Sequence, residues 1–360
     1  MTIPPLDADA MRQAQARIDI LTMPRGALGR LLPLAVQLAG IRRTARPSVS
    51  RKVILTLAAD HGVAAEGVSA YPQEVTAQMV ANIAAGGAGV SVLARQAGAR
   101  VVVADLGVAR PLPVPYVPGK LLDLKVGPGT ANLAKGPAMT PEEARRAVAQ
   151  GRKAAEDLIS GKEGCDCLGL GEMGIANTTS ASAITAVLTG RKPSEVTGRG
   201  TGVGDQALAA KVTLLEKALA KHRPDPRDAY DVLSKVGGFE IGGIAGACLA
   251  AAGLGVPVVI DGFICTAGAA LACRIEPGVQ PYLIASHRSV EPGHRALLDL
   301  LGLQPLLDLD LRLGEGTGAA LAFPLLESAC RILVEMATFE GAGVSDAAKK
   351  EALAEGYRPA

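Results

Sequence analysis

Residues 165–179 read CDCLGLGEMGIANTT, an apolar run that passes into glycines and then into amide and hydroxyl side chains. The apolar part, residues 165–170, has the length and composition of a strand that is buried on both faces. The Asn-Thr-Thr segment that follows suits the first turn of a helix, where backbone amides lack partners. A strand that leads through a glycine-containing turn into a helix is the unit from which α/β folds are built.

Strands of the same kind recur along the chain. Short apolar, β-branched runs bounded by Gly, Asp or Pro predict strands at 53–59, 101–106, 256–260 and 282–286. Strict alternation of apolar and polar residues predicts one more at 307–313, half exposed or near the sheet edge. A capping box with proline at the first helical position, Thr140-Pro141-Glu142-Glu143, predicts a helix that runs to about residue 159. We therefore expect an α/β fold with a doubly wound, Rossmann-like, mostly parallel sheet.

The two ends of the chain differ from its middle. Residues 1–42 and 323–360 are helical in pattern and contain none of the polar loops that follow the expected strands. We expect these two segments to form one small helical domain, with a catalytic α/β domain at 43–322.

The composition limits the classes of partner. Lys plus Arg (37) and Asp plus Glu (35) nearly cancel over the 360 residues, so no overall positive field attracts nucleic acid. Aromatic residues make up only 2% of the chain and Trp is absent, which leaves few surfaces on which single-stranded bases can stack. We therefore expect a small-molecule ligand and no nucleic acid.

Other sequence features bear on the cellular compartment. The N-terminus lacks the basic and apolar regions of a secretion signal, and the six cysteines contain no Cys-x-x-Cys pair. These observations predict a cytoplasmic protein with reduced core thiols. The uncharged stretch within 240–261 is long enough to span a bilayer, but it is rich in Gly and Ala, and Pro257 introduces a Val-Val-Ile run. We expect a buried helix and a central strand there, and no membrane association.

Ligands of such sheets bind where strands end and helices begin. Polar residues mixed with glycine follow nearly every expected strand: Asp60-His61-Gly62-Val63, residues 171–179, Asp261-Gly262-Phe263, Ser286-His287-Arg288-Ser289 and Gly314-Glu315-Gly316-Thr317-Gly318. These loops are the expected site.

The 171–179 loop suits one phosphate monoester. Gly174 lets the backbone turn, and Asn177 and Thr178 offer an amide and a hydroxyl at a helix N-terminus. A plain N-cap without a ligand is the alternative. The glycines from 169 to 174 also match the spacing of a dinucleotide-binding fingerprint, but the acidic residue required about twenty residues later is supplied only by Glu195, in a Lys-Pro-Ser-Glu turn.

A second glycine cluster, residues 198–204, precedes a helix that carries Lys211. Backbone amides can approach an oxyanion at such a cluster, and the Lys211 ammonium can add positive charge. A flexible surface loop is the alternative.

Two carboxylates follow expected strands and lie next to glycine. Glu315 precedes a helix expected near Thr317, and Glu172 occupies a similar place in the 171–179 loop. On one cleft they would supply a base and stabilise positive charge at a sugar carbon. For Glu315, an acid that only stabilises a helix dipole is the alternative. His287 and His294 lack the spacing of a strong metal site, so we expect no metal.

A series of motifs occurs in order across roughly residues 20 to 340: Asp60-His61-Gly62, Glu66-Gly67-Val68-Ser69, Pro72-Gln73-Glu74-Val75-Thr76, Gly171-Glu172-Met173-Gly174-Ile175 with Asn177-Thr178-Thr179, Gly200-Thr201-Gly202, Asp261-Gly262-Phe263, Ser286-His287 and Gly314-Glu315-Gly316-Thr317-Gly318. In these motifs the chain resembles the nicotinate-nucleotide:dimethylbenzimidazole phosphoribosyltransferase family.

The resemblance implies a homodimer of Rossmann-like and small helical domains that uses no cofactor. The implied reaction converts nicotinate mononucleotide and 5,6-dimethylbenzimidazole into α-ribazole 5′-phosphate and nicotinate, in nucleotide-loop assembly of cobalamin. Glu315 is then the general base. The chemistry of this reaction predicts inversion at the ribose C1′ and makes Glu172 the second catalytic carboxylate, which stabilises positive charge there. The implied substrate-binding residues are Tyr71 and Met79 at the benzimidazole, together with Gly174, Asn177, Thr178, Gly202, Lys211, Asp261, Ser289 and Gly314.

Two points stay open at this level. Some members of the family carry serine where this chain has Tyr71 and glutamine near Met79, so the preferred base is not fixed. The same loops would also suit a nucleotide sensor or an NAD-dependent dehydrogenase. A Glu315→Gln variant that binds ligand without turnover would exclude the sensor, and thermal protection by NAD but not by nicotinate mononucleotide would favour the dehydrogenase.

Overall fold

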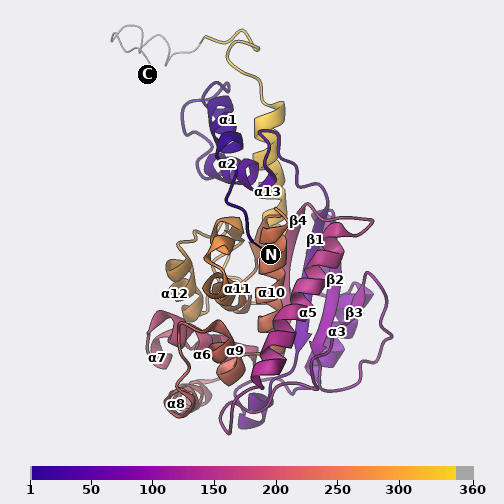
Figure 1. Cartoon of the computed structure of the whole chain (residues 1–360), viewed down its shortest axis with the longest axis vertical. Helices are drawn as coiled ribbons and strands as arrows, with labels where there is room; N and C mark the ends of the chain where they lie inside the picture. Colours follow the sequence, from indigo (N-terminus) through magenta and orange to yellow (C-terminus); the bar gives the residue numbers. More distant parts are fainter. Residues whose placement is uncertain (1, 346–360) are drawn as a thin grey trace. The chain divides into compact units, whose positions relative to one another are not determined.

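The computed structural model describes residues 2–345, which form two compact units (Figure 1). Of these residues, the first unit contains 2–5 and 50–323, and the second contains 6–49 and 324–345. The last part of the expected C-terminal helical segment, 346–360, lies outside the described residues.

Within the described part of the chain, the first unit contains the six strands of the sheet and most of the helices. Its elements are β1 (Lys52–Ala59), η1 (Gly62–Glu66), α3 (Val75–Ala85), α4 (Gly89–Gln96), β2 (Ala99–Gly107), β3 (Leu121–Asp123), α5 (Pro141–Ser160), β4 (Cys167–Met173), α6 (Asn177–Thr189), α7 (Pro193–Val196), α8 (Asp205–His222), α9 (Ala229–Val236), α10 (Phe239–Gly253), β5 (Val258–Ile260), α11 (Phe263–Ile275), η2 (Pro277–Tyr282), β6 (Leu283–Ala285) and α12 (Pro292–Leu301). The second unit contains α1 (Ala8–Ile18) and α2 (Leu31–Arg42). The boundary between the units falls at Pro324, within α13 (Thr317–Glu335).

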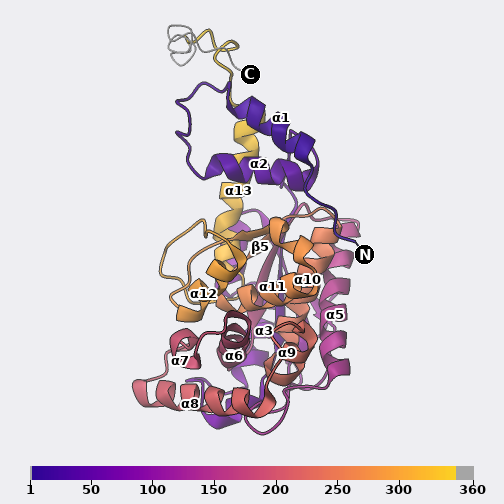
Figure 2. The ribbon, with the colours of Figure 1, turned by 60° about the vertical axis from the view of Figure 1, so that its left-hand side comes forward.

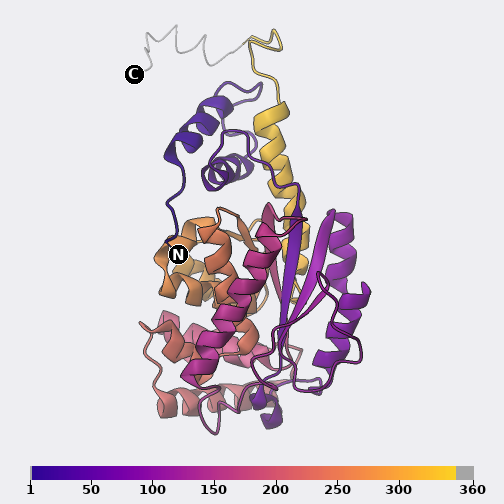
Figure 3. The same ribbon diagram turned by 45° about the vertical axis from the view of Figure 1, so that its right-hand side comes forward.

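The sheet has the strand order β3-β2-β1-β4-β5-β6, and every neighbouring pair is parallel. Winding therefore reverses its direction between β1 and β4, the place where ligands of doubly wound sheets bind, outside the carboxyl ends of the strands. Figure 3 shows the strands between α5 on one side and the purple helices α3 and α4 on the other. Helices α6 to α9 gather at one end of this unit (Figure 2).

Alternate residues of β1 serve the two faces of the sheet. Leu57 approaches Gly243 of α10, whereas Ile54 approaches Gly316 at the start of α13. Successive side chains of a strand point to opposite faces, so a strand covered on both sides is apolar at nearly every position. The five strands expected from apolar runs are all present, and the doubly wound parallel sheet is confirmed.

The strand expected at 307–313 is wrong. Leu307 makes one isolated parallel bridge with His287, and the segment then continues as an irregular loop in which Asp310 adopts a φ of +54°. Leu309 and Leu313 are 53% and 60% exposed, so the alternating leucines do not share one buried face. Alternation indicates a strand only where a neighbouring surface buries one set of side chains. The short strand β3 was not predicted, because three residues are too few to show a period.

The α5 helix begins as its sequence predicts. Thr140 Oγ1 accepts the Glu143 N–H at 3.1 Å, and Glu143 Oε2 accepts the Thr140 N–H at 2.8 Å. Further along, glycines let α5 and α10 pack at backbone contact: a methyl group on Gly151 would lie 1.9 Å from the Gly243 carbonyl oxygen. No side chain can yield there, because the obstructing atom belongs to the backbone.

Gly151→Ala is therefore expected to lower the free energy of unfolding by about 1–3 kcal/mol or more. Alanine is the better helix former by about 1 kcal/mol, so the clash must outweigh a gain in propensity. Urea unfolding measures the change. Gly136→Ala is the matched control, because a methyl group there meets nothing within 4 Å. Equal stability of the two variants would contradict the proposed close contact.

The apolar stretch within 240–261 is a buried helix followed by a buried strand, as expected. Two other stretches, 75–96 and 317–335, are long and apolar enough to cross a bilayer. The first of them is broken, since α3 ends at Ala85 and α4 begins at Gly89. Part of each stretch is buried inside the fold, as in core helices of comparable composition.

Candidate active site

A cavity of about 490 Å³ opens at the carboxyl ends of β4, β5 and β6. It contains three carboxylates, one guanidinium and many apolar side chains. Its lining residues are Tyr71, Val75, Met79, Glu172, Met173, Gly174, Ile175, Asn177, Thr178, Gly200, Thr201, Gly262, Phe263, Ile264, His287, Ser289, Glu291, Arg312, Leu313, Gly314 and Glu315.

Glu315 lies in the loop that leads into α13, and this loop packs against the end of β4. Its backbone has a φ of +65°, a conformation that non-glycine residues adopt only under tertiary constraint. The constraint comes from both sides, because the Glu315 N–H donates to Glu172 O at 3.1 Å and Thr56 Oγ1 donates to Glu315 O at 2.8 Å. Gly171 allows this approach, since a methyl group there would lie 2.0 Å from the Glu315 carbonyl oxygen.

The Glu315 carboxylate is only slightly exposed. The residue is 4% exposed, and its Oε2 accepts the Val90 N–H at 3.0 Å. Burial raises the pKa of Glu315, and the hydrogen bond from Val90 opposes part of that rise. A carboxylate with a raised pKa is a stronger proton acceptor.

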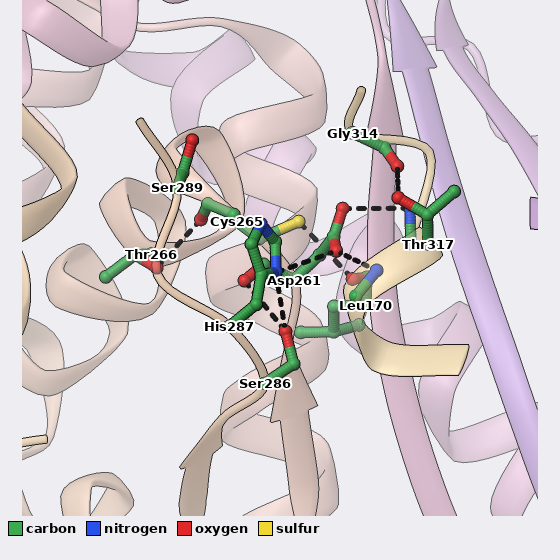
Figure 4. Close-up of polar contacts among 12 residues, drawn as sticks. Leu170, Asp261, Cys265, Thr266, Ser286, His287, Ser289, Gly314 and Thr317 are labelled. Atoms are coloured by element: carbon green, nitrogen blue, oxygen red, sulfur yellow. Dashed lines mark hydrogen bonds and ion pairs between the residues drawn. The ribbon is translucent and has the colours of Figure 1, made fainter. Parts of the chain in front are cut away.

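Asp261 positions the same loop (Figure 4). Its Oδ2 accepts the Gly316 N–H at 3.0 Å, and its Oδ1 accepts the Gly318 N–H at 2.6 Å. Burial raises the pKa of Asp261 to about 7, although these backbone hydrogen bonds oppose the shift. Asp261 does not line the cavity. The sequence placed it at the substrate, whereas the structure places it at the loop that carries Glu315.

Glu172 ends β4 and faces the same cavity. It is 7% exposed, and its Oε2 accepts a short hydrogen bond from Asn177 Nδ2. Burial, followed by the negative charges of Asp261 and Glu240, raises the pKa of Glu172 to about 8. An approaching cation would favour the ionised form and lower this pKa. Gly314 leaves room for the carboxylate, because a methyl group there would lie 2.3 Å from Glu172 Oε1.

The start of α6 forms another wall of the cavity. Ala176 is the N-cap residue with a φ of +74°, and no side chain caps the helix. Gly174 is required by the turn, since a methyl group there would lie 2.3 Å from the Ala59 carbonyl oxygen. Gly174, Asn177 and Thr178 all line the cavity, next to the positive end of the helix dipole.

Lys211 does not line the cavity, but it contacts the start of α6 from behind the lining residues. It is fully buried on α8, and its Nζ donates to Thr178 Oγ1 at 2.8 Å. Burial lowers the pKa of Lys211 to about 8, and the nearby Glu291 carboxylate opposes part of this fall. A bound anion would restore the charged form, as at other anion sites that combine a helix N-terminus with an amine.

The 198–204 loop is partly in the site. Gly200 and Thr201 line the cavity, and the Gly200 N–H donates to Glu291 Oε1 at 2.9 Å. Gly202 instead lines a neighbouring hollow of about 420 Å³, which shares Gly200, Glu291 and Arg312 with the first cavity.

The remaining predicted residues lie in the lining. Tyr71 and Met79 come from the segment before α3 and from α3 itself, beside the apolar side chains of Val75 and Phe263. Ser289 is 8% exposed, and its N–H donates to His294 Nδ1 at 2.9 Å.

The histidines near the cavity are neutral at pH 7. Burial lowers the pKa of His287 to about 4 and that of His294 to about 3. Among the described residues, no group of three His, Cys, Asp or Glu side chains is arranged to hold a metal ion. All six cysteines are free, as predicted.

The sequence missed several residues that line the cavity, notably Glu291, Arg312 and Thr201. Arg312 stands three residues before Glu315, in the segment wrongly expected to be a strand. Thr201 lies within the Gly200-Thr201-Gly202 motif, and Glu291 lies two residues after Ser289. Their places in or beside these motifs could have identified them as site residues.

The glycines that match the dinucleotide fingerprint serve another purpose. Gly169 and Gly171 lie inside β4 rather than in the turn after it. A methyl group on Gly169 would lie 2.9 Å from the Phe323 ring, so this glycine makes room for α13. The fingerprint requires its glycines between the strand and the helix, and only Gly174 lies there.

Comparison with known proteins agrees with this architecture. A family model described as phosphoribosyltransferase matches residues 3–344. The nicotinate-nucleotide–dimethylbenzimidazole phosphoribosyltransferase of Roseiflexus sp. (strain RS-1) is 56% identical over 343 residues, which cover 95% of this chain and 96% of that protein. The protein of the same name from Geobacter sulfurreducens is 54% identical over 342 residues, covering 95% and 96%. The crystal structure of CobT from Thermus thermophilus matches with a TM-score of 0.89 at 52% identity, covering 94% of this chain and 99% of that one. The chain therefore belongs to the nicotinate-nucleotide:dimethylbenzimidazole phosphoribosyltransferase family of enzymes.

Proposed function

We propose that this enzyme transfers the phosphoribosyl group of nicotinate mononucleotide to 5,6-dimethylbenzimidazole. The products are α-ribazole 5′-phosphate and nicotinate, formed during assembly of the nucleotide loop in cobalamin biosynthesis. The main support is that two buried carboxylates, Glu172 and Glu315, line one cavity together with a helix N-terminus suited to a phosphate. The names of the relatives point to the same two substrates.

The phosphate is assigned to the start of α6. Gly174, Asn177 and Thr178 line the cavity there, and Lys211 is bonded to Thr178. The helix dipole and the lysine ammonium both favour a dianion. We assign Ser289 and Gly202, on the neighbouring loops, to the same ribose-phosphate end.

The benzimidazole is assigned to the apolar end of the cavity. Tyr71, Val75 and Met79 offer one aromatic and two aliphatic surfaces there, and Leu313 adds a third aliphatic surface. A flat aromatic base buries its faces against such side chains. Tyr71 and Met79 are therefore the residues expected to set base preference.

The two carboxylates have separate roles in the reaction. The C1′–N bond of the nucleotide breaks with its electron pair moving to the pyridinium nitrogen, so nicotinate leaves without a general acid. Positive charge develops at the ribose C1′, and the Glu172 carboxylate stabilises it. The lone pair of one benzimidazole nitrogen forms the new bond on the opposite face, which inverts C1′ from β to α. Glu315 accepts the proton from the other nitrogen, so the new base leaves the reaction uncharged.

The proposal extends to assembly and location. We propose a cytoplasmic homodimer in which the region 43–322 carries the chemistry. The small helical domain expected at 1–42 and 323–360 corresponds, among the described residues, to 6–49 and 324–345, while residues 2–5 belong to the first unit. Equilibrium sedimentation of the full chain tests the dimer.

Incubation of the purified enzyme with nicotinate mononucleotide and a panel of bases tests the reaction. The bases should include 5,6-dimethylbenzimidazole, benzimidazole, adenine and a phenol. We expect an α-riboside phosphate and free nicotinate without added metal, identified by mass spectrometry and by the anomeric proton signal. Phosphoribosyl pyrophosphate is the control donor and should give no product. Absence of product across the panel, or a β-anomer, would overturn the proposal.

A further inference from the structure

We propose that Thr201 is a positioning residue that holds the 67–74 segment, and with it Tyr71, at the base end of the cavity. The inference rests on the proposed function, because it concerns binding of the acceptor base. The inference gives the 198–204 loop, which contains Thr201 and was assigned above to the nucleotide, a second role in base binding.

Val68 packs the start of the 67–74 segment into the core at 4% exposure, whereas residues 69–74 are half-buried or exposed. It connects η1, which ends at Glu66, with α3, which begins at Val75. Tyr71 is 56% exposed, so burial does not fix its position. Beyond Val68, the position of the segment depends on hydrogen bonds on both sides of Tyr71 and on the ion pair between Arg110 and Glu74. On the α3 side, Gln73 Nε2 donates to His61 O at 3.2 Å.

On the η1 side the hydrogen bonds lead to Thr201. The Ala70 N–H donates to Thr201 Oγ1 at 2.9 Å, and the Ser69 hydroxyl lies 3.1 Å from the same oxygen. Ser69 Oγ in turn accepts the Tyr71 N–H at 3.3 Å. The Tyr71 backbone is thus linked through one serine to Thr201, 130 positions later in the chain. A change at Thr201 can therefore reach Tyr71 without altering α3 itself.

Thr201 can hold this segment because its own loop is fixed. The Gly200 N–H donates to Glu291 Oε1 at 2.9 Å, and Glu291 is only 7% exposed. Gly200 has a φ of +52° and packs on Thr178, where an added methyl group would lie 2.6 Å from Oγ1. An ion pair between Arg199 and Asp205 closes the loop.

One loop therefore contacts both ends of the cavity. Gly200 touches Thr178 at the proposed phosphate position, and Thr201 bonds the segment that places Tyr71. Loss of the Thr201 hydroxyl should leave the Gly200 contacts in place, because these use the backbone and Glu291. The expected defect is thus in base binding and not in nucleotide binding.

The test uses Thr201→Val, which keeps the branched shape and removes the acceptor oxygen. We expect the KM for 5,6-dimethylbenzimidazole to rise about three- to tenfold, as for one or two neutral hydrogen bonds. The KM for nicotinate mononucleotide should change by less than about twofold, because the contacts of Gly200 at the nucleotide end remain. Thr201→Ser keeps the acceptor and should behave as the wild type. Thr213→Val, an exposed site on α8, is the matched control.

Hydrogen exchange provides a readout that does not depend on turnover. Amides in peptides covering 67–74 should exchange faster in Thr201→Val than in the wild type, and should return to the wild-type rate in Thr201→Ser. Unchanged exchange would overturn the inference, as would an equal rise of both KM values or equal behaviour of the Val and Ser variants. If the wild type makes no riboside phosphate, the proposed function fails, while the exchange result still decides whether Thr201 holds the segment.

Discussion

Glu315→Gln is expected to lower kcat about 10²- to 10⁴-fold, the usual contribution of a positioned general base. The amide has the shape of the carboxylate, and its oxygen can still accept the Val90 N–H, so the loop should keep its conformation. The amide cannot take up the benzimidazole proton. The dissociation constant for nicotinate mononucleotide, measured by calorimetry, should therefore stay nearly unchanged while turnover is lost.

The acidity of the acceptor base makes this test more specific. Benzimidazoles with electron-withdrawing substituents lose their N–H proton more readily, so they depend less on a base in the transition state. The ratio of wild-type to Glu315→Gln kcat should consequently fall as the base becomes more acidic. Glu216→Gln, exposed on α8, is the control for the chemical change. A ratio that does not vary with acidity would assign Glu315 a role other than proton removal.

Glu172→Gln should lower kcat about 10²- to 10³-fold, which is the usual effect of removing one group that stabilises charge in a transition state. The amide oxygen can still accept from Asn177, so the end of β4 should be preserved. The variant lacks the negative charge that the developing cation requires. Single-turnover measurement of nicotinate release follows the bond-breaking step directly.

The pH dependence gives a second readout for Glu172. Its pKa of about 8 means that the carboxyl group of the free enzyme is mostly protonated at pH 7, and a protonated group does not stabilise a cation. The value of kcat/KM, which reports the free enzyme, should therefore rise with pH up to about 8, above which loss of the Lys211 charge opposes any further rise. Glu172, Asp261 and Glu315 interact, so the apparent value describes the cluster and not one residue.

Glu172→Gln should remove this rising limb near pH 8. Persistence of the limb in the variant would assign it to Asp261 or Glu315 and would contradict the proposed role of Glu172. A kcat within about threefold of the wild type would contradict it as well.

Much of the fold could be predicted because its strands are buried on both faces. Continuous apolar runs such as the one in β1 leave little room for another interpretation, and the Thr140 capping box marks the start of α5 by local chemistry alone. The 307–313 segment shows that alternation without a burying surface does not make a strand. Its alternating leucines fit a strand, but no neighbouring surface buries Leu309 or Leu313, and the segment is a loop.

The site could be predicted in part for a related reason. Parallel strands bring their carboxyl ends to one edge of the sheet, so polar loops after several strands must meet there. That rule predicted Glu172 and Thr178 as neighbours of one cavity, and Glu315 lies there too although the strand expected before it is a loop. It did not predict Arg312 or Glu291, because each reaches the cavity from a loop whose path depends on long-range contacts.

The sequence by itself determined the five strands that are continuous apolar runs, the start of α5 and the loops that carry the chemistry, because each depends on hydrophobic burial or local hydrogen bonding within a few residues. The tertiary structure alone decided the function of individual groups within those loops. Asp261 holds the Gly316 and Gly318 amides, Gly171 admits the Glu315 backbone, and Thr201 reaches the Tyr71 segment. Each of these contacts joins residues far apart in the chain at a separation of a few ångströms. No local pattern specifies such a distance, since it follows from how the whole sheet and its helices pack.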